Sequence, residues 1–176
     1  MMHTRSVTSL VGLDKPENTE FAFVIGSVIQ QARDAIANHA IDKGFDYVLW
    51  LDSDMTYAPS TLWDLMFQGK DIVSAISYKK QFPLTPIVYE ETDGGFQPVP
   101  NEMIPKEIFR TDAVGFGCVL TKTSALKKVR ESGEMFSPYT RTGEDISFCM
   151  RAKKAGLEIW CDPNVKCGHL TAIEVK

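Results

Sequence analysis

Residues 46–54, Asp-Tyr-Val-Leu-Trp-Leu-Asp-Ser-Asp, decide the fold of this chain. The run from Tyr47 to Leu51 is apolar and aromatic, which is typical of a buried strand, and it ends in the carboxylates of Asp52 and Asp54. Because side chains alternate along an extended backbone, both carboxylates are expected to point the same way and to approach one cation together. In an open α/β sheet, strand carboxyl ends border the ligand-binding crevice, so this pair marks a candidate site.

Strand and helix patterns alternate on both sides of this run. Before it, the sequence predicts a helix near Ser6 to Leu13, a strand from Phe21 to Ile25, and a helix through Ile29 and Ala40 that Gly44 ends. After it, we expect a helix opened by Pro59 and Ser60, a strand over Ile72 to Ile76, and a hairpin and loops between Gln81 and Pro105. The rest of the chain predicts a strand over Val114 to Leu120, a helix over Ser124 to Arg130, a helix from Ile146 that ends at Gly156, and a strand over Leu157 to Cys161. This alternation predicts an α/β fold with a largely parallel sheet and helices on both faces.

Composition limits the class of protein and its partners. The chain has 176 residues, 44% of them hydrophobic and 24% charged, which suits a single globular domain over residues 1–176. The net charge of -4 argues against a nucleic-acid partner, and a phosphate-bearing ligand would need a metal ion to supply positive charge. We expect no membrane span, a cytoplasmic location, and four cysteines that are reduced core thiols.

The tripeptide Asp52-Ser53-Asp54 suits a hard cation. Magnesium and manganese prefer oxygen ligands, and they accept substrate phosphates to complete their coordination shell. The structural alternative is an Asx turn or a helix cap after the strand, for which aspartate is equally suited.

The run Thr142-Gly143-Glu144-Asp145 precedes an amphipathic segment. It places Asp145 in a first helical turn, where the helix dipole favours an ionised carboxylate that can act as a base. Thr142 and Asp145 also have the spacing of a capping box, which would make both residues purely structural. The sequence alone supports both interpretations.

Three further features have two interpretations each. Gly115 and Gly117 either let a ligand approach the backbone or permit a β-bulge. His169 is either a metal ligand or a surface residue, and Arg33 either reaches a phosphate or is an ordinary ion-paired arginine.

Taken in order, these motifs resemble the GT-A-type glycosyltransferases, specifically the small family 2-like enzymes of bacteria and phages. The resemblance runs from about Phe21 to Leu170 and implies a Rossmann-like GT-A sheet. It implies transfer of a sugar from a nucleotide-diphosphate sugar to a glycan, lipid or protein hydroxyl, with inversion. The chain is expected to differ from that family at its start, where the pattern of the family's first strand is not found, so that the sheet would be N-terminally shortened.

The same resemblance assigns roles by position. Asp145 would be the catalytic base, and Mn2+ or Mg2+ would be bound by Asp52, Asp54 and His169. The substrate-binding residues would be Arg33, Asp52, Ser53, Gly115, Phe116, Gly117 and Glu144.

Two alternatives remain open from the sequence. The run from Asp52 to Thr56 also resembles the nucleophile motif of haloacid dehalogenase-like phosphatases. The acidic motif of those enzymes follows an apolar strand, whereas the segment from Phe136 to Arg141 is polar and interrupted by proline. The second alternative is a GT-A-like domain that binds a sugar or a partner without catalysis.

Overall fold

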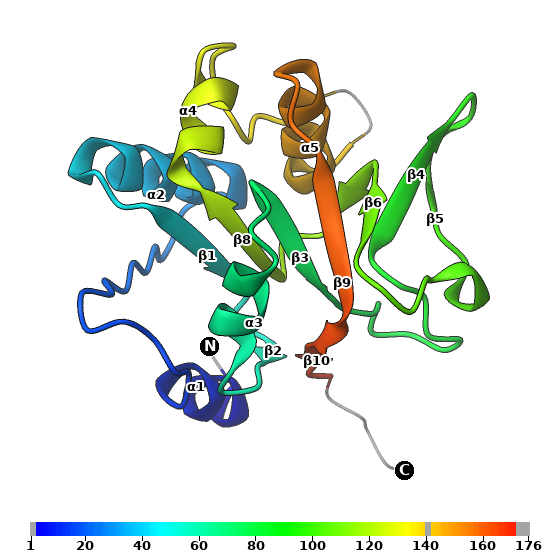
Figure 1. The fold of residues 1–176 in the computed structure, drawn as a ribbon, viewed down its shortest axis with the longest axis horizontal. Coiled ribbons are helices and arrows are strands. Elements are labelled where there is room, and N and C mark those ends of the chain that lie inside the picture. The colour runs from blue at the N-terminus through cyan, green and yellow to red at the C-terminus, as the bar shows by residue number, and fades with distance from the viewer. Residues whose placement is uncertain (1–2, 140–141, 172–176) are drawn as a thin grey trace.

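The computed structural model describes residues 3–139 and 142–171. Figure 1 shows the elements in chain order. The helices are α1 (Thr4–Val11), α2 (Ile29–Lys43), α3 (Thr61–Phe67), η1 (Asn101–Met103), α4 (Thr123–Arg130) and α5 (Glu144–Lys154). The strands are β1 (Tyr47–Leu51), β2 (Met55–Thr56), β3 (Ile72–Ile76), β4 (Val88–Thr92), β5 (Gly95–Pro98), β6 (Phe109–Thr111), β7 (Ala113–Val114), β8 (Cys118–Lys122), β9 (Ile159–Lys166) and β10 (Gly168–His169).

The central sheet has five strands in the order β1-β8-β3-β9-β6. Only β3 and β9 pair in parallel, and the other three pairs are antiparallel. The prediction of a largely parallel sheet is therefore wrong, although the mixed sheet is consistent with a Rossmann-like fold. Two of the antiparallel pairs involve β8, which inserts between β1 and β3 and runs against both, and the third joins the edge strand β6 to β9. Strand β8 follows β7 through a short turn at residues 115–117, so no crossover helix sets its direction.

Two smaller sheets flank the central one. Strands β4 and β5 form a hairpin that pairs with β7, on the side of the molecule away from α2 (Figure 1). Strands β10 and β2 form an antiparallel pair in which His169 lies opposite Met55. This pair brings residues from the end of the described chain beside the turn that follows β1.

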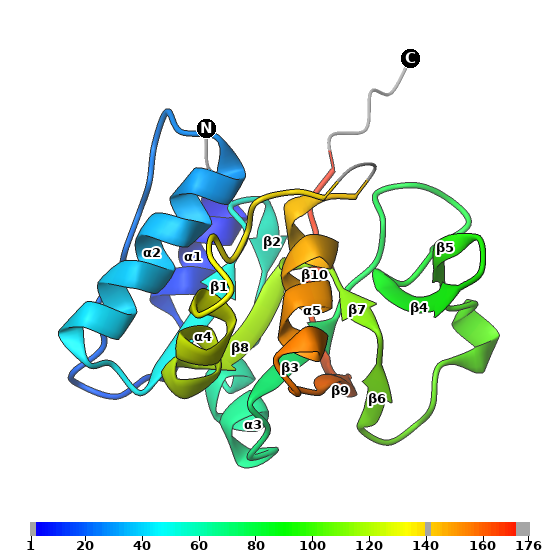
Figure 2. The same ribbon diagram turned by 90° about the horizontal axis from the view of Figure 1, so that it is seen from above.

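Helices cover both faces of the central sheet, as predicted. Figure 2 shows α2, α4 and α5 side by side over one face. Helix α3 packs on the opposite face against β3, β8 and β9, and α1 lies against β2. Within residues 3–139 and 142–171, no helix is both long enough and apolar enough to cross a bilayer.

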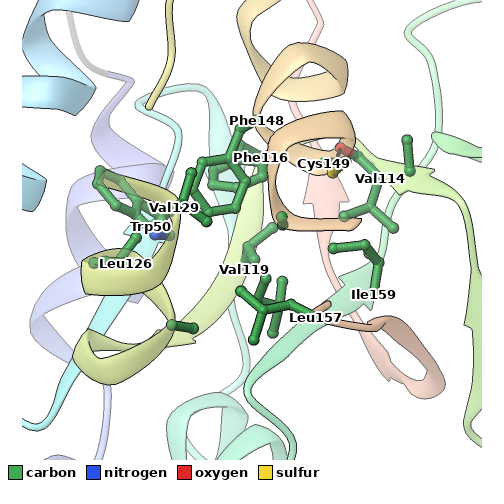
Figure 3. Packing of buried hydrophobic residues seen from close by; sticks show 14 of the residues in the cluster. Trp50, Val114, Phe116, Val119, Leu126, Val129, Phe148, Cys149, Leu157 and Ile159 are labelled. Carbon is green, nitrogen blue, oxygen red and sulfur yellow. Dashed lines mark hydrogen bonds between the residues drawn. The ribbon is translucent and has the colours of Figure 1, made fainter. Parts of the chain in front are cut away.

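The larger hydrophobic core lies between the sheet and α2, α4 and α5, and its centre is aromatic (Figure 3). Trp50, Phe116, Phe136 and Phe148 are each no more than 4% exposed. The ring centroid of Phe116 lies 5.0 Å from that of Phe148 and 5.3 Å from that of Phe136, with the rings edge to face. Aromatic pairs favour this arrangement, so the cluster fixes the segment around Phe116 relative to β1 and α5.

Most predicted elements are confirmed, including β1, α2, α3, β3, α4 and α5. The predicted strand at Phe21 to Ile25 is wrong, because these residues are exposed and lie outside any strand, with Phe23 64% and Ile25 93% exposed. The predicted strand over Val114 to Leu120 is two strands, interrupted by the turn at residues 115–117. All four cysteines are buried and free, as expected for core thiols.

Candidate active site

The aspartates after β1 lie in a turn. The Met55 N–H donates to the Asp52 carbonyl over 3.4 Å, which closes the turn immediately after the strand. The extended geometry expected for Asp52 and Asp54 is therefore wrong, and each carboxylate has a different cationic partner. The two side chains are nevertheless close enough for the charge of Asp54 to raise the pKa of Asp52, in addition to the larger effect of burial.

Asp54 faces two basic side chains. The Lys80 ammonium donates to Asp54 Oδ2, and His169 Nε2 lies 3.6 Å from the same oxygen. Although partial burial opposes ionisation, the Lys80 hydrogen bond and charge hold the pKa of Asp54 below its usual range. Asp54 is thus an ionised carboxylate that already has a cationic partner.

The backbone fixes which nitrogen of His169 faces Asp54. His169 Nδ1 lies 2.8 Å from the Tyr78 carbonyl oxygen, which can only accept a hydrogen bond. Nδ1 therefore carries the proton, and in the neutral ring Nε2 is left with a free lone pair directed toward Asp54. Histidines that bind metals are commonly oriented by such a carbonyl.

Arg33 joins the turn to helix α5. It is only 6% exposed, and its guanidinium donates to Asp52 Oδ1 over 3.2 Å and to Glu144 Oε1 over 2.7 Å. Its Cζ atom also lies 5.1 Å from the centroid of the Phe116 ring. An arginine is suited to this position because its planar group can stack on a ring while it binds two carboxylates. Glu144 and Asp52, which lie on separate elements, are thereby held together.

The stretch from Gly115 to Gly117 lies between two carboxylates. A Cβ on Gly117 would lie 3.7 Å from Asp52 Oδ2, and a Cβ on Gly115 would lie 3.7 Å from Asp145 Oδ2. Asp52 and Asp145 therefore approach the same short segment from its two ends. Phe116 is 1% exposed, so its ring is a core group, and any contact of this stretch with a substrate would be through the backbone.

Asp145 lies in the first turn of α5, as predicted. The helix begins after Gly143, no side chain caps it, and Thr142 instead shares a 2.7 Å hydrogen bond with Ser147. The capping-box interpretation is therefore wrong. Asp145 Oδ1 accepts the Ile146 N–H over 2.7 Å, and Oδ2 has no hydrogen-bond partner among the described residues. Burial raises the pKa of Asp145, and the neighbouring charge of Glu144 adds to that effect.

Sequence reasoning assigned no role to Tyr57 or Lys80. The Tyr57 hydroxyl donates to the carbonyls of Asp52 and Gly117, over 2.7 and 3.2 Å, and so ties the turn to the glycine stretch. Burial raises the pKa of Tyr57, which keeps this phenol a donor. Ser53 is exposed at the tip of the turn. Its predicted role in substrate binding stays a prediction, as do those of Arg33, Glu144 and the glycine stretch.

The donor set suits a divalent ion that also binds a phosphate ligand. Among residues 3–139 and 142–171, no three His, Cys, Asp or Glu side chains converge at metal-binding spacing. Asp54 Oδ2 and His169 Nε2, 3.6 Å apart, are two potential ligands, and Asp52 Oδ2 is the carboxylate oxygen to which Arg33 does not donate. Magnesium and manganese commonly bind to few protein ligands and take the rest from water and substrate phosphates, so these residues fit such an ion.

Comparisons with known proteins support the fold. No family model matches the chain, and no curated protein matches it in sequence. A197 from STIV superposes with a TM-score of 0.59 at 17% identity, over 83% of this chain and 69% of that one. A crystal structure of GalNAc-T7 with UDP, GalNAc and Mn2+ superposes with a TM-score of 0.55 at 13% identity, over 83% of this chain. This chain spans 31% of that protein, and at these identities the likeness supports a GT-A-like fold and nothing about activity.

Proposed function

We propose that this protein is a metal-dependent glycosyltransferase that moves a sugar from a nucleotide-diphosphate sugar to an acceptor hydroxyl. One observation carries the proposal: Asp145 and the turn that holds Asp52 and Asp54 approach opposite ends of the stretch from Gly115 to Gly117. Among the described residues, a carboxylate without an ion pair and a turn with two aspartates thus lie at the two ends of one three-residue stretch, an arrangement that suits a displacement reaction.

The donor side of the proposed site is the turn. Asp54 and His169 would hold Mn2+ or Mg2+, with Asp52 alongside, and the ion would act as a Lewis acid that neutralises the departing diphosphate. Arg33 keeps Asp52 in place and, with Ser53 and Glu144, is proposed to contact the nucleotide sugar. The bound ion would supply the positive charge that phosphate binding needs in a protein whose net charge is -4.

The acceptor side is the start of α5. Asp145 would take the proton from the attacking hydroxyl as the new glycosidic bond forms, and the hydroxyl oxygen would displace the diphosphate. A single displacement of this kind inverts the anomeric centre. We propose a glycan, lipid or protein as the acceptor, because each offers a hydroxyl and none requires a basic binding surface.

No observation favours the phosphatase alternative. Its acidic motif would have to follow a strand, whereas Asp145 lies in the first turn of α5, after a segment without strand structure at residues 131–139. A phosphatase would hydrolyse a simple phosphoester in the presence of magnesium, which is a direct assay for that class.

Thermal unfolding with nucleotide sugars tests the proposal. We expect a nucleotide sugar at about 100 times its Kd to stabilise the folded state by about 2.7 kcal/mol in the presence of Mn2+. For a chain of this size the melting temperature should rise by about 5 to 10 °C. Asp54→Ala should abolish the rise, whereas Asp93→Ala, which changes an exposed aspartate in the β4–β5 turn, should retain it.

Turnover separates a transferase from a domain that only binds. Release of nucleoside diphosphate in the presence of an acceptor is the expected result. A Mn2+-dependent rise in melting temperature without turnover of any nucleotide sugar would instead indicate the non-catalytic alternative. A shift that survives Asp54→Ala would contradict the proposed metal site.

The pH dependence of kcat should report Asp145. The ionised form is the base, so the rate should fall as the pH drops through the pKa of Asp145. Because burial and the Glu144 charge raise that pKa, the midpoint should lie above about 3.9, the value of a free aspartate. Glu144→Gln removes the negative charge and releases Arg33, whose charge lowers the pKa of Asp145, so the midpoint should move to lower pH.

A kcat profile over the acidic range measures this midpoint. Glu134→Gln is the matched control, since Glu134 is exposed in the segment between α4 and α5 and should leave the midpoint unchanged. An unchanged or higher midpoint in the Glu144→Gln protein would show that another group is the titrating base.

A further inference from the structure

We propose that Lys80 is a resident counter-cation of this site. Its ammonium pairs with Asp54 when no divalent ion is bound and competes with that ion for the carboxylate. When the ion binds, the ammonium moves to pair with the diphosphate of the donor. This inference rests on the proposed function, because it concerns the same metal and the same leaving group.

The loop after β3 places Lys80 beside Asp54. The Ile87 N–H donates to the Ser77 carbonyl and the Lys79 N–H to the Thr85 carbonyl, each over 2.9 Å, so the base of the loop is held like a hairpin. Lys80 is the next residue, beyond these bonds. The loop therefore fixes the backbone just before Lys80 and leaves its side chain to reach Asp54.

The same loop also orients the histidine. The Tyr78 carbonyl holds His169 Nδ1, and Lys80, two residues later, binds the carboxylate that faces His169 Nε2. One short segment thus supplies both the carbonyl that orients His169 and the ammonium on Asp54. A chance surface ion pair would not be expected to share its segment with the group that sets the histidine tautomer.

Lys80 and a divalent ion cannot both occupy this position. The Lys80 ammonium and His169 Nε2 face the same oxygen of Asp54, so an ion held by Asp54 and His169 would bind the oxygen to which the ammonium now donates. A divalent ion and an ammonium on one carboxylate oxygen would repel each other strongly. The side chains of Lys80 and Asp54 are 38% and 44% exposed, so the lysine can move away without disturbing the core.

A displaced Lys80 would have a second anion as a partner. Lysine is a flexible point charge that commonly binds phosphate groups, so a donor diphosphate bound beside Asp54 would accept the ammonium in place of the carboxylate. The positive charge that leaves Asp54 would then stabilise the leaving group. Asp54 would thus have a cationic partner in both states, namely Lys80 without the ion and the ion itself when it is bound.

Binding measurements on the full chain test this inference without relying on activity. In Lys80→Met, we expect Mn2+ to bind about tenfold more tightly by titration calorimetry, because the competing charge-assisted hydrogen bond is gone. At saturating Mn2+, inorganic pyrophosphate should bind about tenfold more weakly. Lys79→Met is the matched control, since the Lys79 ammonium lies 5.9 Å from the Tyr89 ring centroid, and it should change neither affinity.

The outcomes distinguish this inference from the proposed function. Unchanged or weaker Mn2+ binding in Lys80→Met would overturn the competition, and unchanged pyrophosphate binding would overturn the transfer of charge to the phosphates. If Mn2+ binding is lost in Asp54→Ala but unaffected in Lys80→Met, the metal site stands and only the role of Lys80 fails. If neither the wild type nor Lys80→Met binds Mn2+, the inference fails together with the metal site.

Discussion

Asp145→Asn is expected to lower kcat for sugar transfer by about a thousandfold, which is within the usual contribution of a general base. The amide keeps the size of the carboxylate but cannot accept the proton of the acceptor hydroxyl. Its oxygen can still accept the hydrogen bond from the Ile146 N–H, so the start of α5 should keep its geometry. Steady-state kinetics with any active donor and acceptor pair measure the loss.

Binding by the same variant separates catalysis from folding. Asp145→Asn should retain Mn2+ binding and the donor-dependent rise in melting temperature, because Asp54 and His169 are untouched. Asp93→Asn, an equivalent change at an exposed turn, should retain full turnover. Wild-type kcat in Asp145→Asn would remove Asp145 from the mechanism, whatever its position in the structure.

The charge balance of the site explains why Asp145 is suited to this role. Asp52 and Glu144 share Arg33, and Asp54 has Lys80. Among the described residues Asp145 has no ion-pair partner, and burial disfavours its charged form. Burial raises the pKa of Asp52 as well, but Asp52 is held by Arg33, so Asp145 is the unpaired carboxylate with a raised pKa that a general base requires.

Local patterns in the sequence predicted most elements because those patterns report short-range physics. The apolar run from Tyr47 to Leu51 can form only a buried strand or a buried helix, and its length and aromatic content favour the strand that is observed. Gly44 ends α2 in the left-handed conformation with φ of 76°, as its position predicted. The placement of Asp145 in a first helical turn followed from the same kind of pattern.

Long-range pairing could not be obtained in this way. Nothing local to Cys118–Lys122 indicates that this strand inserts between β1 and β3. The relative directions of the strands were therefore predicted wrongly. Phe21 to Ile25 has the composition of a strand but lies outside the sheets of the structure. Strand propensity describes how well a residue fits a pleated surface, and without that surface it predicts nothing.

The partners of the site residues were equally inaccessible. Arg33 contacts Glu144 across 111 positions of the chain, and Lys80 contacts Asp54 across 26. The expectation that Asp52 and Asp54 point the same way assumed that the strand continues, whereas the chain turns directly after Leu51. The residue types of the site followed from the sequence, but the arrangement of their charges required the fold.

Phe116→Ala is expected to lower the free energy of unfolding by about 4 kcal/mol, the usual cost of truncating a buried phenylalanine. The ring is 1% exposed and contacts the rings of Phe136 and Phe148, so its removal leaves a cavity in the main core. Phe116→Leu fills most of that space and should cost about 1 to 1.5 kcal/mol. Urea unfolding, compared at equal m-values, measures both changes.

The comparison of these two variants links the core to the site. Phe116 lies between the glycines that adjoin Asp52 and Asp145, and its ring supports the Arg33 guanidinium at 5.1 Å. Phe116→Ala should therefore weaken Mn2+-dependent binding of the nucleotide sugar even at temperatures where the protein is fully folded. Phe116→Leu should keep most of that binding, because it preserves the packing beneath Arg33. If Phe116→Ala costs no more stability than Phe116→Leu is expected to cost, the aromatic cluster does not anchor this segment. The hydrogen bonds of Tyr57 and Arg33 would then be the contacts that hold Asp52 beside it.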